Sequence, residues 1–329
     1  MSLPRIGITL GDPGGIGPEI VLKAFAGKFK LPGAQYILFG TRRFFEREEK
    51  ALGTALPLRD RSVDKTRPPG SLEIREIPAP AGAGRRGSSR AASGLASFRY
   101  FEEAVAEARR GDLDAVVTAP ISKAAWSLAG ERWKGHTEYL RRFYPGAIMA
   151  FWSKPLKVAL VSHHVSLRAA LKKIKKDALR EYFLSLDRSL SGKGKTRFEF
   201  VVSGLNPHAG EQGLLGREEI EAVGPAVEEA RRLGVRISGP FPPDVVFRSA
   251  VGRRDVFVIA LYHDQGLIPF KLLAFESGVN VSLGLPFVRT SPDHGTAFDI
   301  AGQNRADPRS MVEAVRLAAF LVARSATRP

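Results

Sequence analysis

The chain alternates short apolar runs with longer stretches in which apolar residues recur at helical spacing. Short apolar runs indicate buried strands, and they occupy residues 6–10, 36–39, 114–118, 158–161, 198–202 and 256–261. Helical spacing is clearest in residues 95–108, 220–230 and 315–322, and a glycine loop after the first strand leads into a helix from about residue 17. This alternation predicts an α/β protein whose mostly parallel sheets are covered by helices.

Two polar segments interrupt this pattern. Residues 78–93 are rich in Ala, Gly, Arg and Ser, and residues 191–196 are rich in Gly, Lys and Ser. Both are expected to be exposed loops, and both are too short for a linker between domains. A length of 329 residues suits one large α/β unit or two joined lobes.

The composition is that of a globular protein, with 44% hydrophobic and 26% charged residues. No apolar run approaches the roughly 20 residues that span a bilayer, and the N-terminus lacks the features of a signal peptide. The absence of cysteine excludes disulfides, thiolate metal sites and a cysteine nucleophile. We therefore expect a cytoplasmic protein without a membrane partner.

The net charge raises the alternative that the chain is a basic nucleic-acid-binding protein rather than an enzyme. Fifty basic residues against 34 acidic ones give a net charge of +16. The charge is scattered in pairs, such as Arg42-Arg43, Arg85-Arg86 and Arg109-Arg110, rather than concentrated in one region. Scattered charge favours a solvated surface that attracts small anions, so no specific nucleic-acid partner is expected.

Three predicted strands run directly into histidine. His163 and His164 follow residues 158–161, His208 follows residues 198–202, and His263 follows residues 256–261. In open α/β sheets the carboxyl ends of the strands carry the ligand site. Three neutral imidazoles with one open position would suit a divalent metal ion. The alternative is that these are separate loop histidines, each with its own hydrogen bond.

Two further polar motifs stay open between a structural and a functional interpretation. Residues 11–19, GDPGGIGPE, match neither the dinucleotide fingerprint nor a Walker loop, so a tight strand-to-helix turn is favoured, with Pro18 and Glu19 suited to the first helical turn. The cluster Gly135-His136-Thr137-Glu138 suits either a helix cap or a contact to a carboxylate or phosphate.

The segment 262–302 is the densest in chemically useful side chains. Lys271, Asn280 and Arg289 together would suit a phosphate or carboxylate group. The alternative is that Lys271 and Arg289 are solvent-exposed surface residues without a function. Both have apolar neighbours in the sequence, which makes this alternative less favoured.

Taken together, residues 11–19, 135–140, 204–211, 240–247 and 262–302 resemble the 4-hydroxythreonine-4-phosphate dehydrogenase family of pyridoxal phosphate biosynthesis. The resemblance spans nearly the whole chain and is most specific in "GLNPHAGE", "YHDQG" and "RTSPDHGTAFDIAG". The last motif is also similar to the adenosine-binding loop of isocitrate and isopropylmalate dehydrogenases, and "GGIGPE" is similar to their "GDGIGPE".

The resemblance implies a two-lobed fold like that of isocitrate and isopropylmalate dehydrogenases. Residues 1–133 and 286–329 would build one lobe from both chain ends. Residues 134–285 would build a central lobe that holds the metal ligands and the dimer contacts. The active site would lie in the cleft between the lobes of a homodimer and would be shared between subunits.

The resemblance also assigns roles to individual residues. The implied metal ligands are His164, rather than His163, with His208 and His263. The implied substrate contacts are His136, Thr137, Lys271, Asn280 and Arg289. The implied cofactor contacts are His294, Gly295, Thr296 and Asp299. Asp244, Asp264 and His136 are the candidates for the general base.

The implied activity is the oxidation and decarboxylation of 4-phosphohydroxy-L-threonine to 3-amino-1-hydroxyacetone phosphate and CO2. NAD or NADP would accept a hydride from the carbon that bears the hydroxyl, and one divalent ion of Zn, Mg, Mn or Co would stabilise the hydroxyl oxygen as an alkoxide. The alternative within the same chemistry is a paralogue that acts on a phosphorylated threonate or on a cis-dihydrodiol.

Overall fold

The computed structural model of the chain describes residues 3–60, 69–191 and 197–324. The chain divides into two compact units: one holds the residues up to Pro145 together with Pro286–Ala323, and the other holds Gly146–Leu285 with Arg324. The first boundary between the units therefore follows Pro145, whereas the sequence placed it after residue 133. Residues 134–145 belong to the first unit because Tyr139 packs edge-on against Phe98 and Phe101 of that unit. Most of the loop expected at 191–196 lies outside the described residues.

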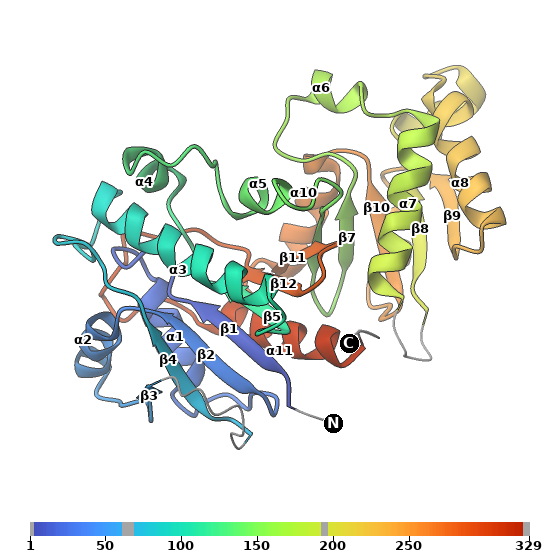
Figure 1. Ribbon diagram of the computed structural model, residues 1–329. Helices are drawn as coiled ribbons and strands as arrows, with labels where there is room; N and C mark the ends of the chain where they lie inside the picture. The colour runs from blue at the N-terminus through green and yellow to red at the C-terminus, as the bar shows by residue number, and fades with distance from the viewer. Residues whose placement is uncertain (1–2, 61–68, 192–196, 325–329) are drawn as a thin grey trace. The chain divides into compact units, whose positions relative to one another are not determined.

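The first unit is built on a parallel sheet of strand order β3-β4-β2-β1-β5-β12 (Figure 1). Its strands are β1 (Arg5–Thr9), β2 (Gln35–Gly40), β3 (Arg59–Asp60), β4 (Leu72–Glu76), β5 (Ala115–Thr118) and β12 (Val288–Pro292). The late strand β12 pairs with β5, so segments far apart in the sequence complete one sheet. The parallel arrangement confirms what the alternation of strands and helices predicted.

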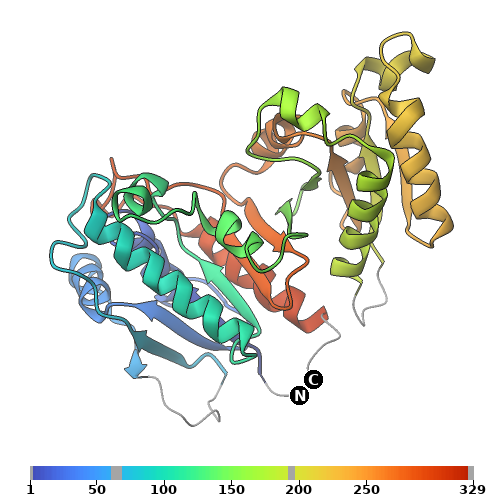
Figure 2. The same cartoon turned by 45° about the horizontal axis from the view of Figure 1, so that its top comes forward.

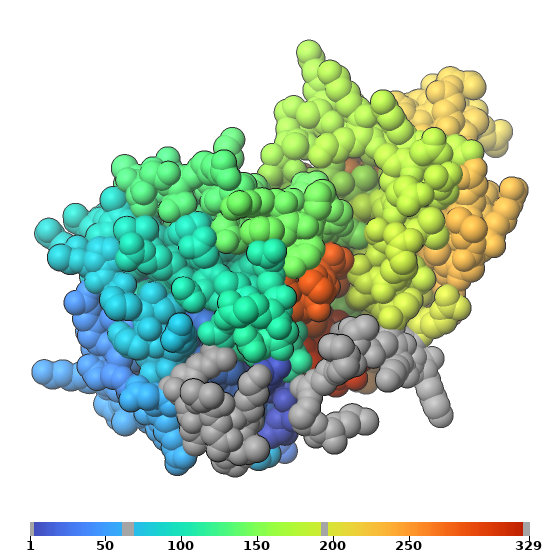
Figure 3. Space-filling view, in the orientation of Figure 1, coloured from blue at the N-terminus to red at the C-terminus, as the bar shows by residue number. Residues whose placement is uncertain are grey.

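Helices cover both faces of this sheet. They are α1 (Gly17–Phe25), α2 (Arg42–Leu52), α3 (Ala91–Arg109), α4 (Lys123–Leu128), α5 (His136–Arg141) and α11 (Arg309–Arg324). The long helix α3 crosses one face, and α11 lies on the other (Figure 2). In the space-filling view, the side chains of α3 form much of the visible surface of this unit (Figure 3).

Residues 78–90 form an irregular loop whose residues, apart from Gly84, are exposed or half-buried, as the composition predicted, whereas the end of the segment enters a helix. Helix α3 begins at Ala91, and Ser93 is fully buried. Gly94 allows this buried packing, because a β-carbon there would collide with the backbone of Ala125 in α4. Trp126 is buried beside it and donates a 2.9 Å hydrogen bond from Nε1 to Ser97 Oγ. The end of the segment is thus helical, and Ser93 within it is buried.

The second unit has a mixed sheet of strand order β11-β6-β7-β10-β8-β9. Its strands are β6 (Ile148–Trp152), β7 (Lys157–Leu160), β8 (Glu199–Ser203), β9 (Ile237–Phe241), β10 (Val256–Ala260) and β11 (Val279–Leu283). Strands β7, β10, β8 and β9 are parallel, whereas β6 is antiparallel to both of its neighbours. The core beneath this sheet includes Phe151, Val158, Val258 and Phe270.

The helices of the second unit have between five and 15 residues. They are α6 (Leu167–Leu171), α7 (Lys176–Leu190), the 3-10 turn η1 (Pro207–Gly213), the π-helical turn η2 (Glu219–Val223), α8 (Gly224–Arg232), α9 (Val246–Ala250) and α10 (His263–Ala274). The helix expected over 220–230 is therefore two elements. Pro225 lacks an N–H and cannot continue the hydrogen-bond ladder from η2 into α8. No helix in the described ranges is both long and apolar enough to cross a membrane.

Candidate active site

Three neighbouring parallel strands of the second unit end in loops that carry histidine. Strand β10 lies between β7 and β8 and runs parallel to both. Their carboxyl ends therefore meet at one edge of the sheet, where the chain continues to His164, His208 and His263. The adjacency of the three strands agrees with the arrangement that the sequence suggested.

His164 and His263 lie close together at this edge. Their ring centroids are 5.7 Å apart. Both residues line a pocket with a volume of about 290 Å³, whose wall also includes Ser162, Tyr262 and Asp264. His164 adopts a positive φ of 48°, which is uncommon for a residue with a side chain and marks a backbone that its surroundings hold in place.

The hydrogen bond of His263 decides which ring nitrogen is available. Nδ1 of His263 lies 2.7 Å from Oδ1 of Asp264, its neighbour in α10. An ionised carboxylate only accepts, so the imidazole proton lies on Nδ1 and the lone pair of Nε2 remains for a ligand. Metal-binding histidines in proteins characteristically have this partner on the other nitrogen. The pair therefore has the donor chemistry that a divalent ion requires.

His208 lies on an unusual turn. Residues 208–212 all have positive φ values, which gives a left-handed turn within η1. The His208 side chain is 68% exposed, and its Nδ1 is 3.9 Å from Oε2 of Glu211. Within residues 3–60, 69–191 and 197–324, no three histidine or acidic side chains are grouped so that they could hold a metal. The structure thus pairs His164 with His263 and leaves His208 apart from them.

Two buried side chains tie the histidine loops to the sheet. Gln265 accepts a 2.7 Å hydrogen bond from the N–H of Leu261 and donates one of 2.7 Å to the carbonyl of Gly204. It thereby connects the segment before His263 to the segment before His208. Glu219 accepts hydrogen bonds from the N–H groups of Leu205 and Asn206 at 2.7 and 2.8 Å. Sequence reasoning assigned a role to neither residue.

In the first unit, Arg289 and His136 form a buried polar pair. Arg289 lies on β12 with only 3% of its surface exposed. Its guanidinium donates to Thr118 Oγ1 at 2.7 Å and to Nδ1 of His136 at 3.0 Å. Burial lowers the pKa of Arg289 to about 10, partly opposed by the charge of Glu138, so it stays positively charged at neutral pH. Because Arg289 is buried, it is not a solvent-exposed surface residue.

This pair fixes the state of His136. Burial holds the pKa of His136 well below its ordinary value, and the positive charges of Arg289 and Lys123 lower it further. The ring is therefore neutral at pH 7. Because a guanidinium only donates, Nδ1 accepts and the single proton lies on Nε2. That nitrogen is buried and has no hydrogen-bond partner in the described chain. The arrangement presents one N–H donor that a bound anion could satisfy.

The remaining substrate candidates differ in their surroundings. Thr137 is buried at the start of α5, which confirms that the polar cluster at 135–138 opens a helix. Lys271 is half-buried on α10, with Nζ 5.5 Å from the centre of the Phe275 ring. Asn280 is half-buried on β11, and Asp244 is exposed before α9. His136, Thr137 and Arg289 thus belong to the first unit, and Lys271 and Asn280 belong to the second.

The candidate cofactor loop follows β12 and packs against the N-terminal glycine loop. The carbonyl of Thr296 accepts a 3.0 Å hydrogen bond from the N–H of Ile16. A β-carbon at Gly15 would lie 2.7 Å from the same carbonyl, so only glycine permits this approach. The segment 11–19 is a strand-to-helix turn, as its composition favoured, and it also supports the loop that carries His294, Gly295, Thr296 and Asp299.

Asp12, in that glycine loop, was not singled out by sequence reasoning. It is fully buried, and Oδ1 accepts a 2.8 Å hydrogen bond from the N–H of Gly14. Oδ2 is buried without a partner in the part of the chain that the structure describes. Burial raises the pKa of Asp12 to about 6, and the Gly14 hydrogen bond opposes the rise. An unsatisfied buried acceptor beside Gly15 fits a cofactor that brings a hydroxyl or amide donor.

Asp12→Asn should change how stability depends on pH. The folded state raises the pKa of Asp12 from 3.8 to about 6, so the folded protein binds this proton more tightly than the unfolded chain. Ionisation of Asp12 therefore lowers the stability as pH rises through that window. Between about pH 5 and about pH 8, the wild type should lose about 1–2 kcal/mol of unfolding free energy relative to the variant.

Urea unfolding of the cofactor-free protein at both pH values measures this difference. Asp60→Asn is the matched control, because the Asp60 side chain is 88% exposed. A difference between wild type and Asp12→Asn that stays constant across the pH range would contradict the assignment.

Comparison with known proteins identifies the family of the chain. The family model described as "Pyridoxal phosphate biosynthetic protein PdxA" matches residues 33–318. The 4-hydroxythreonine-4-phosphate dehydrogenase of Aquifex aeolicus is 41% identical over 95% of this chain and 97% of its own length. The D-threonate 4-phosphate dehydrogenase of Pectobacterium atrosepticum is 40% identical over 95% of this chain and 98% of its own.

A solved structure extends the comparison to the fold. The crystal structure of 4-hydroxythreonine-4-phosphate dehydrogenase from Klebsiella pneumoniae superposes with a TM-score of 0.85 at 39% identity, covering 97% of this chain and 99% of that one. Both units of the present chain therefore have counterparts in a single known enzyme fold. From a family match over most of its length and relatives at about 40% identity along nearly all of it, the chain belongs to the PdxA family of pyridoxal phosphate biosynthetic proteins.

Proposed function

We propose that the protein is a metal- and NAD(P)-dependent dehydrogenase that oxidises and decarboxylates 4-phosphohydroxy-L-threonine. The products would be 3-amino-1-hydroxyacetone phosphate and CO2. The observation that carries the proposal is the pair His164 and His263, which line one pocket at the ends of adjacent parallel strands. Membership of the PdxA family supports the same conclusion.

The metal would be held by imidazole nitrogens from the second unit. His164, His208 and His263 are the proposed ligands, and Asp264 would orient His263 through its hydrogen bond to Nδ1. Imidazole ligands suit Zn or Co, and Mg or Mn are the other candidates. When bound, the metal would act as a Lewis acid at the substrate hydroxyl, and NAD or NADP would accept the hydride.

Residues of the chain would bind the substrate and neutralise its negative charge. Arg289 would contribute a fixed positive charge, and His136 would donate from Nε2 to an anionic oxygen of the substrate. Thr137, Lys271 and Asn280 are the further proposed contacts. The loop with His294, Gly295, Thr296 and Asp299 would hold the cofactor, with its position set by the hydrogen bond from Ile16.

A base must accept the proton of the substrate hydroxyl as the hydride leaves its carbon. His136 is poorly suited, because Nδ1 already accepts from Arg289 and Nε2 carries a proton. Asp264 is already bonded to His263. Asp244 makes no hydrogen bond or ion pair within the described residues, and its side chain is exposed. We therefore favour Asp244 as the base.

The test is NADH formation followed by absorbance, with 4-phosphohydroxy-L-threonine as substrate and with or without EDTA. The expected result is turnover that EDTA abolishes and that added Zn or Co restores. Activity that persists after the metal has been removed would rule out the metal-dependent mechanism. Absence of turnover in a preparation that binds both metal and NAD would instead exclude this substrate.

D-threonate 4-phosphate is the second candidate substrate. A relative with that named activity is 40% identical to this chain, against 41% for one named for 4-hydroxythreonine 4-phosphate. Both substrates carry the phosphate and hydroxyl that the site would bind, and they differ at the carbon next to the carboxylate. The ratio of kcat/KM for the two compounds, measured in the same preparation, decides between them.

We also propose that the protein is a cytoplasmic homodimer. Helix α10 and the residue that follows it expose four large apolar side chains, namely Ile268, Leu272, Leu273 and Phe275. Leu272 is 82% exposed and Phe275 is 72% exposed in the single chain. Contiguous apolar surface of this kind marks an interaction site. A second copy of the chain is the proposed occupant.

Leu272→Asp should shift the protein from dimer to monomer, because a buried, unpaired carboxylate opposes association. Light scattering after size-exclusion chromatography measures the mass. Leu128→Asp, at a residue of α4 that is 62% exposed, is the control and should leave the mass unchanged. A wild type that is monomeric at the same concentration would contradict the dimer.

A further inference from the structure

The segment 78–93, whose function the sequence left open, contacts the candidate cofactor loop through Arg86. The Arg86 guanidinium packs directly onto Gly302, where a β-carbon would collide with it. Gly302 adopts a positive φ of 78° at the end of the motif that begins at His294. An arginine in the first unit thus forms part of the surface on which this loop rests.

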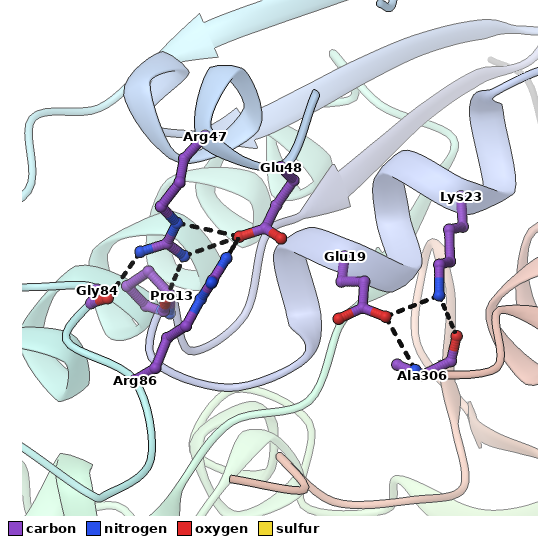
Figure 4. Close-up of polar contacts among 8 residues, drawn as sticks. All are labelled: Pro13, Glu19, Lys23, Arg47, Glu48, Gly84, Arg86 and Ala306. Atoms are coloured by element: carbon purple, nitrogen blue, oxygen red, sulfur yellow. Dashed lines mark hydrogen bonds and ion pairs between the residues drawn. The ribbon is translucent and has the colours of Figure 1, made fainter. Parts of the chain in front are cut away.

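Arg86 is held by a buried glutamate on α2. Glu48 is 3% exposed, and its Oε1 accepts from Nη2 of Arg86 at 2.5 Å and from Nε of Arg47 at 3.0 Å (Figure 4). Arg47 in turn donates to the carbonyl of Gly84 at 2.7 Å and to that of Pro13 at 3.1 Å. A single carboxylate therefore orients two guanidinium groups.

The two arginines contact different segments. Arg47 bonds to the glycine loop through Pro13 and to the segment 78–93 through Gly84, whereas Arg86 packs on Gly302. The glycine loop itself meets the cofactor loop at Thr296. Three segments that are distant in sequence are thus connected through Glu48.

A second network fixes the far end of the same loop. Lys23 donates to the carbonyl of Asn304 at 3.1 Å. It also donates to the carbonyl of Ala306 at 2.8 Å, and Glu19 accepts from the N–H of Ala306 at 2.9 Å (Figure 4). Glu19 and Lys23 also pair with each other at 2.7 Å. The loop is thereby anchored at residue 296, at residue 302 and at residues 304–306. Only the contact at residue 302 depends on the segment 78–93.

We propose that Glu48 and Arg86 are positioning residues for dinucleotide binding: Glu48 orients Arg86, and Arg86 sets the conformation of residues 294–302. The inference rests on the proposed function, because it takes this loop to be the cofactor site. A planar guanidinium that lies on a glycine backbone has a fixed orientation, which a lysine ammonium lacks. A loop with a defined conformation binds its ligand without an ordering cost.

The test compares Glu48→Gln and Arg86→Lys with the wild type in three measurements. They are the Kd for NAD, the Kd for Zn, and hydrogen exchange of the amides in residues 296–306 without cofactor. We expect the Kd for NAD to rise about tenfold in both variants, with faster exchange in the loop. The Kd for Zn should be unchanged, because the proposed metal ligands belong to the other unit.

Glu107→Gln is the matched control. Glu107 is similarly buried on α3 and pairs with Arg75 of β4, outside the loop. It should lower stability without changing the Kd for NAD. If Glu48→Gln fails to fold, Arg86→Lys still tests the proposal, because it retains a positive charge beside Glu48.

The outcomes separate the two proposals. A wild type that binds no NAD overturns the proposed function and this inference with it. A wild type that binds NAD, with folded variants of the same affinity, overturns the inference alone. Faster loop exchange without loss of NAD affinity would also overturn it, because the loop would then be held by Arg86 without serving the cofactor.

Discussion

Alanine in place of His263 should reduce kcat by about a thousand-fold or more and leave the protein folded. The proposed metal supplies several kcal/mol of stabilisation to the developing negative oxygen, which corresponds to a loss of that size when it is removed. The fold should persist because His263 begins α10 at the edge of the sheet, with 39% of its side chain exposed. His208→Ala should also leave the protein folded, because its side chain is 68% exposed.

Metal content, kcat at saturating NAD, and thermal unfolding should be measured on the same preparations. The adjacent pair His163 and His164 offers a matched control. His164→Ala should lose the metal, whereas His163→Ala should retain it. A His263→Ala protein that keeps a full complement of metal and near-normal turnover would remove the imidazole site from the mechanism.

The sequence predicted β1, β2, β5, β7, β8 and β10 and missed β3, β4, β6, β9, β11 and β12, of which β12 is the clearest case of buried polarity. Strand β12 contains Arg289, Thr290 and Ser291, all buried. Two of these side chains have hydrogen-bond partners inside the first unit: Arg289 donates to Thr118, and Thr290 donates to the carbonyl of Ala314. A strand with buried polar residues that pair with distant partners has no continuous apolar run, so it cannot be recognised from apolar runs in the sequence.

Short helices were missed for a different reason. Helices α4, α5, α6 and α9 have five or six residues each, which is less than two turns. Helical spacing cannot be recognised over so few positions. The start of α5 was nevertheless indicated by the cluster at 135–138, although the N-cap residue Gly135 provides no side-chain cap.

In the candidate site, too, the sequence revealed features that are local in the chain and missed those that depend on distant partners. Strand ends located the histidines because each signal is local in sequence. The connection that Gln265 makes between the histidine loops was missed because its partner Gly204 is 61 residues away. The contact of Thr118 with Arg289 was missed because the two residues are 171 positions apart. The three histidines also show the limit of the strand-end argument. His164 and His263 lie close together, whereas His208 lies on a left-handed turn and joins no group of three possible metal ligands within the described residues.

Arg289→Lys should raise the KM for the phosphorylated substrate by about a hundred-fold, with a KM for NAD within about twofold of the wild type. Charge-assisted hydrogen bonds contribute about 1.5–3 kcal/mol each. Lysine retains the charge but lacks the planar fork that reaches Thr118 and His136 together. Loss of the donor at Nδ1 would also free His136 to move its proton from Nε2, which removes the donor proposed for the substrate.

Steady-state kinetics with each substrate varied in turn measures both constants. Arg316→Lys is the control, because Arg316 is an exposed arginine of α11 that pairs with Glu313 on the same helix. Restoration of the lower KM by added guanidinium ion would support a missing planar donor rather than a misfolded site. A folded Arg289→Lys protein with wild-type KM for both substrates would mean that the buried pair with His136 serves only the stability of the first unit, and the anion would then have to be recognised by Lys271 and Asn280.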